Sequence, residues 1–194
     1  MDVDWVESSE LHGPAFAEAG DPPPRLMLFG AVELSAALSR LAHALGWRSY
    51  VVDPRAQHLL VERFPDADEL ICAWPEEAFS RLGGIDEQTA VAVLTHDPVL
   101  DDPALVIALR SPAMFVGGMG SRRTQERRRS RLMEEHGLGE EEVGRLSGPI
   151  GLDLGARTAQ ETALSILSEI VAVAHGRGGG RLRAAEGSIR EAQA

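Results

Sequence analysis

The stretch 26-LMLFGAVELSAAL-38 joins a short apolar run to a helix-like segment through a single glycine, Gly30. A strand, a glycine turn and a helix start form the layout of a Rossmann phosphate-binding loop. The fingerprint G-x-G-x-x-G/A asks for a second glycine where this chain has Val32, followed by Glu33, and for a third where it has Ser35. The stretch therefore predicts the first strand and helix of a Rossmann-like sheet, and leaves open what that loop binds.

Outward from this stretch, apolar runs alternate with helix-like segments. The strand-like runs occupy residues 25–30, 48–54, 69–74, 89–98 and 113–121, and the helix-like segments occupy 33–46, 55–65, 75–84, 101–111, 122–137 and 156–176. Continuous apolar strands that alternate with helices are typical of a parallel sheet covered on both faces. We therefore expect an α/β fold, a Rossmann-like three-layer α/β/α arrangement with a mainly parallel sheet of about five strands.

The two ends of the chain differ in composition from this middle part. We expect residues 1–24 to be an acidic leader, because they end in three prolines that favour an extended tether, with Trp5 as a candidate docking residue. Residues 25–176 form the expected Rossmann-like domain. Residues 177–194, which follow the helix terminator Gly176, are expected to be a flexible tail.

Composition limits the cellular context. The apolar stretches are far shorter than the roughly 20 residues that span a bilayer, and the acidic N-terminus lacks the features of a secretory signal. A single cysteine, Cys72, excludes an intrachain disulfide, and its apolar neighbours predict a buried, inert thiol. Trp47 and Trp74 flank strands and are expected to seal the core. We expect a cytoplasmic protein without membrane segments.

Charge excludes several classes of function. The net charge is -11, so nucleic acid is not an expected partner. All 19 basic residues are arginine, because the sequence contains no lysine. Schiff-base chemistry and the P-loop lysine are therefore excluded.

Ligands of such sheets bind outside the carboxyl ends of the strands, so the loops there supply the candidate site residues. Gly30 permits the first turn, and Asp53 stands 23 residues beyond it, where a ribose-binding acid belongs. Val32 and Glu33 disfavour NAD(P), because one is a branched side chain and the other a negative charge at the pyrophosphate position. An ordinary turn without a ligand remains the alternative.

The loop after the fourth apolar run offers Thr95, His96 and Asp97. His96 could carry a proton, ligate a metal or donate a hydrogen bond to a ligand. No second histidine or cysteine clusters with it, so we expect no metal site. Asp101 or Asp102 is expected to cap the following helix, with Pro103 in its first turn.

The loop after the fifth run, 117-GGMGSRR-123, predicts the strongest phosphate site. Glycines permit close backbone approach, a serine can cap the next helix, and two guanidinium groups follow. Its candidate residues are Gly117, Gly118, Gly120, Ser121, Arg122 and Arg123. The residues from Arg127 to Arg131 are expected to be solvated or to face a partner, because Arg123, Arg127 and Arg131 share one helix face.

A last glycine-rich loop, 147-SGPIGLDLGARTAQE-161, adds Gly151 and Asp153 as candidates. Thr158 and Glu161 fit a capping box at the start of the final helix.

Three of these motifs together resemble one family. The segments VLTHDPVLDDPAL, FVGGMGSRRT and GPIGLDLGARTAQETALSILSEIVA, with VVDPR, resemble the carboxyl-terminal Rossmann-like domain of the XdhC/CoxI family, the xanthine dehydrogenase accessory factors. The resemblance covers roughly residues 25 to 176. This chain departs from the family pattern at the first loop, where the family commonly has G-A-G-H and this chain has Gly30, Ala31, Val32 and Glu33. Longer members also carry an amino-terminal domain, whereas only the leader precedes the Rossmann part here. We therefore expect a split or stand-alone member, or a paralogue with reduced or altered binding.

The resemblance implies an accessory protein rather than an enzyme, with no catalytic residues. It implies binding of the molybdenum cofactor, molybdopterin, at the candidate loops, and docking to an apo-molybdenum hydroxylase of the xanthine or carbon monoxide dehydrogenase type. A separate amino-terminal-domain protein or a sulfurtransferase is a further expected partner, and a homodimer is left open.

Two alternatives remain. One is an NAD(P)-dependent oxidoreductase in which His96 relays protons. The other is a Rossmann-like interaction module that has lost ligand binding.

Overall fold

Six parallel strands form one sheet in the order β3-β2-β1-β4-β5-β6 in the computed structural model, which describes residues 22–185. The strands are β1 (Arg25–Phe29), β2 (Arg48–Val52), β3 (Glu69–Ile71), β4 (Thr89–Val93), β5 (Phe115–Gly118) and β6 (Leu146–Ser147). This is the strand order of dinucleotide-binding Rossmann domains, with the switch between β1 and β4. The Rossmann-like fold is confirmed, and the sixth strand escaped prediction because it is only 2 residues long.

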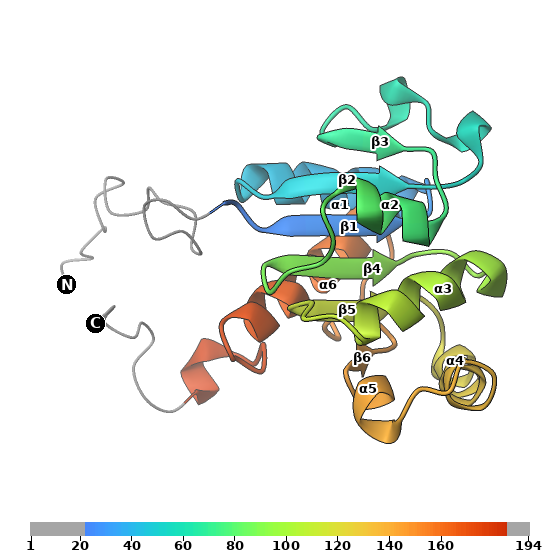
Figure 1. Cartoon of the computed structure of the whole chain (residues 1–194). Coiled ribbons are helices and arrows are strands. Elements are labelled where there is room, and N and C mark those ends of the chain that lie inside the picture. The colour runs from blue at the N-terminus through green and yellow to red at the C-terminus, as the bar shows by residue number, and fades with distance from the viewer. Residues whose placement is uncertain (1–21, 186–194) are drawn as a thin grey trace.

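Helices cover both faces of this sheet (Figure 1). One face carries α1 (Glu33–Ala44) and α6 (Ala159–Ala174), and the other carries α2 (Pro75–Arg81) and α3 (Pro98–Leu109). The helices α4 (Arg122–Glu134) and α5 (Glu140–Gly144) lie at the β6 side of the molecule. The carboxyl ends of the strands and the starts of α1, α3 and α4 meet at the same edge.

The central strand β1 shows why the apolar runs are continuous. Leu26 and Leu28 pack with α1 and α6, whereas Met27 and Phe29 pack with α2 and α3. All four side chains are 0% exposed. A strand buried on both faces does not alternate polar and apolar residues, so a continuous apolar run in the sequence indicates a strand of a parallel sheet.

The segment 55–65, expected to be helical, forms two short turns instead. They are the 3₁₀ turns η2 (Ala56–His58) and η3 (Val61–Arg63), and neither contains a buried residue. A short helix depends on tertiary packing of one apolar face, and this segment has no such face, because Phe64 is buried while Leu60 and Val61 are 50% and 69% exposed. A third 3₁₀ turn, η4 (Leu182–Ala184), lies within the expected tail.

Trp47 is buried as expected, but two other predictions about buried side chains are wrong. Trp74 is 48% exposed, and the thiol of Cys72 is exposed. Both residues follow β3, a strand of 3 residues that pairs with β2 and forms one edge of the sheet within residues 22–185. Trp5 lies outside the described residues. Within residues 22–185, no helix is long and apolar enough to cross a membrane.

Candidate functional site

The loop after β1 is shaped by Gly30. Its φ of +111° favours glycine, and a Cβ there would overlap Cγ2 of Thr95. The backbone N–H of Gly30 donates to the carbonyl of Val52 at 2.8 Å. Val32 is the N-cap of α1 and makes no side-chain capping bond, and Glu33 occupies the first turn. The negative charge of Glu33 therefore occupies the end of α1 at which Rossmann domains bind pyrophosphate.

Asp53, at the end of β2, holds this loop in place. Its carboxylate accepts from the backbone N–H groups of Ala31 and Arg55, both at 3.0 Å, and from the Arg55 guanidinium at 2.8 and 2.9 Å. Burial raises the pKa of Asp53, but these hydrogen bonds outweigh it and the pKa lies below its ordinary value of 3.8. A carboxylate offers about four acceptor sites, so none remains for a ribose hydroxyl.

The loop after β4 starts α3 differently from the prediction. Asp97 is the N-cap, and its Oδ1 accepts from the backbone N–H of Val99 at 3.1 Å. Pro98, not Pro103, is the proline of the first turn, because α3 begins three residues earlier than its apolar pattern. The expected capping by Asp101 or Asp102 is therefore wrong.

Those two aspartates instead pair with arginines of α4. Asp101 and Arg128 are both buried, and Nη2 of Arg128 donates to Oδ2 of Asp101 at 2.9 Å. Burial raises the pKa of Asp101, against the hydrogen bonds from Thr95 and Arg128 that lower it. Asp102 accepts two hydrogen bonds from the guanidinium of Arg131. The expectation that Arg127 to Arg131 are all solvated or partner-facing is therefore wrong at Arg128, which is buried, and at Arg129 and Arg131, which donate hydrogen bonds within the chain.

Arg128 also organises the loop after β5. Its Nη1 donates to the carbonyl of Met119 at 3.0 Å and to Oε1 of Gln125 at 2.8 Å. The amide of Gln125 in turn donates to the carbonyl of Gly118 at 2.8 Å. Thr95 donates to the other oxygen of Asp101. One buried network therefore joins the loops after β4 and β5 to α3 and α4.

A first cavity, of about 430 Å³, opens at the switch in strand order. We call it the switch-point cavity, and it lies where ligands of open α/β sheets bind. It is lined by Val32, Glu33, Leu34, Arg55, Leu94, Thr95, His96, Met119, Ala159 and Thr162.

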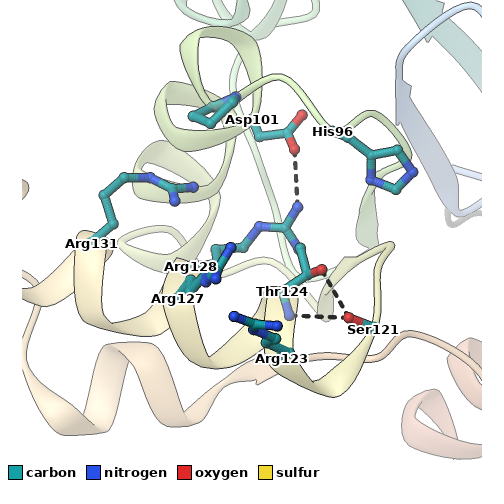
Figure 2. A pocket seen from close by; sticks show the side chains of 9 residues that line it. His96, Asp101, Ser121, Arg123, Thr124, Arg127, Arg128 and Arg131 are labelled. Atoms are coloured by element: carbon teal, nitrogen blue, oxygen red, sulfur yellow. Dashed lines mark hydrogen bonds and ion pairs between the residues drawn. The ribbon is translucent and has the colours of Figure 1, made fainter.

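A second cavity, of about 290 Å³, adjoins the start of α4. We call it the arginine cavity; Figure 2 shows its side chains converging from α3, α4 and the loops before them. It is lined by His96, Pro98, Asp101, Ser121, Arg123, Thr124, Arg127, Arg128 and Arg131. His96, which is exposed, belongs to both linings and joins the two cavities.

The glycines after β5 make close contacts, but with the protein itself. A Cβ at Gly117 would lie 2.5 Å from Cδ1 of Ile150, and one at Gly118 would lie 2.6 Å from Nη1 of Arg128. Gly120 has a φ of +133° and leads to Ser121, whose side chain caps α4. Neither Gly117 nor Gly118 lines either cavity of the described chain.

Two neighbouring arginines that the sequence treats alike are separated by the structure. Arg123 lines the arginine cavity, whereas Arg122 lines neither cavity of the described part of the chain. Successive helical residues point about 100° apart, and this rotation turns Arg122 away from the cavity that Arg123 lines.

The loop after β6 contributes through the helix that follows it. The backbone N–H of Gly151 donates to Oε2 of Glu169 at 2.6 Å, and Asp153 is exposed. Among the described residues that line the two cavities, neither of these candidates occurs. The capping box of Thr158 and Glu161 is confirmed, and it starts α6 beside the switch-point cavity.

Sequence reasoning missed several residues of the two cavities. Arg55 would have been signalled by its position directly after Asp53, and Met119 by its place inside the glycine loop. Arg128 carried no signal that separates it from its arginine neighbours. Within residues 22–185, no group of three or more histidine, cysteine or acidic side chains is arranged to hold a metal ion.

Comparisons with known proteins agree with this architecture. The family model described as the XdhC Rossmann domain matches residues 26–170. A probable xanthine dehydrogenase subunit of Bacillus subtilis is 31% identical over 84% of this chain and 49% of its own length. The molybdenum cofactor insertion chaperone PaoD of Escherichia coli is 31% identical over 78% of this chain and 41% of its own length.

An uncharacterized Escherichia coli protein, YqeB, is 33% identical over 81% of this chain and 28% of its own length. The crystal structure of a xanthine dehydrogenase from Bacillus halodurans matches with a TM-score of 0.68 and 27% identity, over 80% of this chain and 45% of that one. The chain thus spans less than half the length of these relatives. The match covers the sheet, both cavities and most of α6, and the chain belongs to the XdhC Rossmann domain family.

Proposed function

We propose that this protein is an accessory factor for the maturation of molybdenum hydroxylases of the xanthine or carbon monoxide dehydrogenase type. It binds the molybdenum cofactor at the carboxyl edge of the sheet and docks to the apo-enzyme. Family membership and the names of two relatives support the role. The observation that carries it is the pair of cavities that meet at His96 at the switch point.

The chemistry of the two cavities fits a phosphorylated pterin. Guanidinium groups line the arginine cavity, and they are the preferred protein ligands of phosphate. Apolar side chains of Val32, Leu94 and Met119 line part of the switch-point cavity. Its polar lining groups are Glu33, Arg55, Thr95, His96 and Thr162. An apolar wall with a few polar groups suits a flat, hydrogen-bonding ring. The Nε of Arg128, buried without an acceptor among residues 22–185, is a donor such a ligand can use.

In this proposal the chain positions the cofactor and performs no reaction on it. The cofactor supplies the molybdenum chemistry of the client enzyme. His96 orients the ligand where the cavities join, and Val32, Leu94 and Met119 exclude water from one face of it. The candidate residues Gly30, Asp53, Thr95 and Asp97 act by shaping the loops that form the walls.

The test is titration of the purified chain with molybdenum cofactor under anaerobic conditions, followed by co-purification with an apo-molybdenum hydroxylase. His96→Ala is expected to weaken cofactor binding about tenfold or more, which corresponds to one lost hydrogen bond to a charged group. His43→Ala is the matched control, because His43 is exposed in the last turn of α1, at the opposite end of that helix from the cavities. Absence of both cofactor binding and enzyme association would refute the proposal, and enzyme association alone would favour a pure interaction module.

A further inference from the structure

The arginine cavity carries positive charge that the protein itself does not neutralise. Arg128 pairs with Asp101, and Arg131 pairs with Asp102. Arg123 and Arg127, in the described part of the chain, form no ion pair. They stand four residues apart on α4, and like charges at this spacing destabilise a helix. In a chain with a net charge of -11, this local excess of cations favours an anionic ligand.

A buried donor at this cavity points to the same kind of ligand. The side chain of Arg128 is 2% exposed, and both of its Nη atoms are satisfied by the protein. Its Nε has no acceptor within residues 22–185. A buried N–H without a partner is costly, and buried polar groups are usually paired. An oxygen acceptor bound in the cavity is the group that this arrangement lacks.

The start of α4 adds backbone donors on the same side. Ser121 caps the helix and lines the cavity together with Thr124. The first N–H groups of a helix have no intrahelical acceptors, and the helix dipole is positive there. The corresponding position on α1 differs, because Glu33 lies in its first turn. The anion-binding helix of this Rossmann domain is therefore α4 and not α1.

We infer that the arginine cavity is a binding site for a tetrahedral oxyanion, a phosphate group, contacted by Ser121, Arg123, Arg127 and Arg128. Asp101, which also lines the cavity, is a positioning residue that fixes the guanidinium of Arg128 through Nη2. The inference deepens the proposed function, on which it rests for the rest of the ligand. It moves the phosphate from the loop after β1, its place in dinucleotide-binding domains, to the helix after β5.

The experiment measures binding of inorganic phosphate and pyrophosphate by calorimetry at low ionic strength, with chloride at equal ionic strength as the reference. The double variant Arg123→Ala/Arg127→Ala is expected to lose binding about tenfold or more, because two charge-assisted contacts disappear. Both side chains are exposed at the surface of α4, so circular dichroism is expected to show an unchanged fold. Added salt is expected to weaken binding to the unsubstituted protein.

Arg122→Ala is the matched control, because it removes the neighbouring arginine that lies outside the cavity. It is expected to bind phosphate like the unsubstituted protein. Equal losses in Arg122→Ala and the double variant would overturn the inference, as would phosphate binding no tighter than that of chloride.

The outcomes separate this inference from the proposed function. If the double variant binds phosphate normally while the unsubstituted protein binds molybdenum cofactor, the assignment of the phosphate site to the arginine cavity is wrong and the proposed function stands. If phosphate binding depends on Arg123 and Arg127 but neither cofactor nor apo-enzyme binds, the site stands and the proposed function is wrong.

Discussion

At the scale of single residues, the first loop is decided by contacts that short-range sequence does not reveal. Asp53 stands where a ribose-binding acid belongs, yet Arg55 and the N–H of Ala31 occupy its carboxylate. Glycine is required at position 30 because Thr95, in the loop of a neighbouring strand, lies against the Cα of Gly30. The loop thus keeps the shape of a Rossmann turn while its polar groups serve the fold.

Gly30→Ala is expected to destabilise the protein by at least about 2 kcal/mol, because it adds backbone strain at positive φ and overpacks the contact with Thr95. Urea denaturation followed by circular dichroism measures the free energy of unfolding. Gly46→Ala is the control, since Gly46 has a φ of +73° but open space around it, and it is expected to cost only about 1 kcal/mol. Equal costs for the two variants would show that steric contact with Thr95 is unimportant.

At the scale of elements, α4 shows how one helix divides its arginines. Its spacing correctly places Arg123, Arg127 and Arg131 on one face, and that face lines a cavity. Arg128, one residue further round, enters the interior because Asp101 of α3 lies there. A burial of this kind depends on a partner 27 residues away in sequence, so helical periodicity cannot predict it.

At the start of α6, residues close together in the sequence supply all of the capping hydrogen bonds. The hydroxyl of Thr158 accepts from the N–H of Glu161 at 3.1 Å, and the carboxylate of Glu161 accepts from the N–H of Thr158 at 3.0 Å. Thr158→Ala is therefore expected to cost about 1 kcal/mol of stability in thermal unfolding. Thr158→Ser keeps the hydroxyl and is expected to retain most of it. A serine variant as unstable as the alanine variant would argue against the capping explanation.

At the scale of the whole molecule, the sheet topology and the residues of the site indicate different ligands. The strand order is that of a dinucleotide-binding domain, but Val32, Glu33 and the saturated carboxylate of Asp53 occupy the places where a dinucleotide is recognised. The fold alone therefore does not assign the ligand. Phosphate-binding groups gather instead around α4, on the β5 side of the switch point.

NADH and NADPH are accordingly expected to leave the melting temperature unchanged in a thermal-shift experiment. A dinucleotide with a dissociation constant of about 10 μM would stabilise the native state by about 2.7 kcal/mol at about 1 mM. For a protein of this size that is a rise of several degrees. Such a rise would support the oxidoreductase alternative and contradict the present assignment.

The sequence by itself determined the α/β class, the succession of most strands and helices along the chain, and the cap at Thr158. It also determined the edge of the sheet at which the candidate ligand-binding loops lie. These follow from local signals: apolar runs buried on both faces, helical spacing, and glycine or capping residues at turns. The tertiary structure alone decided that the carboxylate of Asp53 is fully occupied, that Cys72 and Trp74 are exposed, and that Arg123 rather than Arg122 lines a cavity with buried Arg128. The physical reason is that the exposure, pairing or cavity position of each of these side chains depends on which residues of other elements lie beside it. Burial, charge pairing and cavity walls are set by neighbours in space, which the order of residues along the chain does not specify.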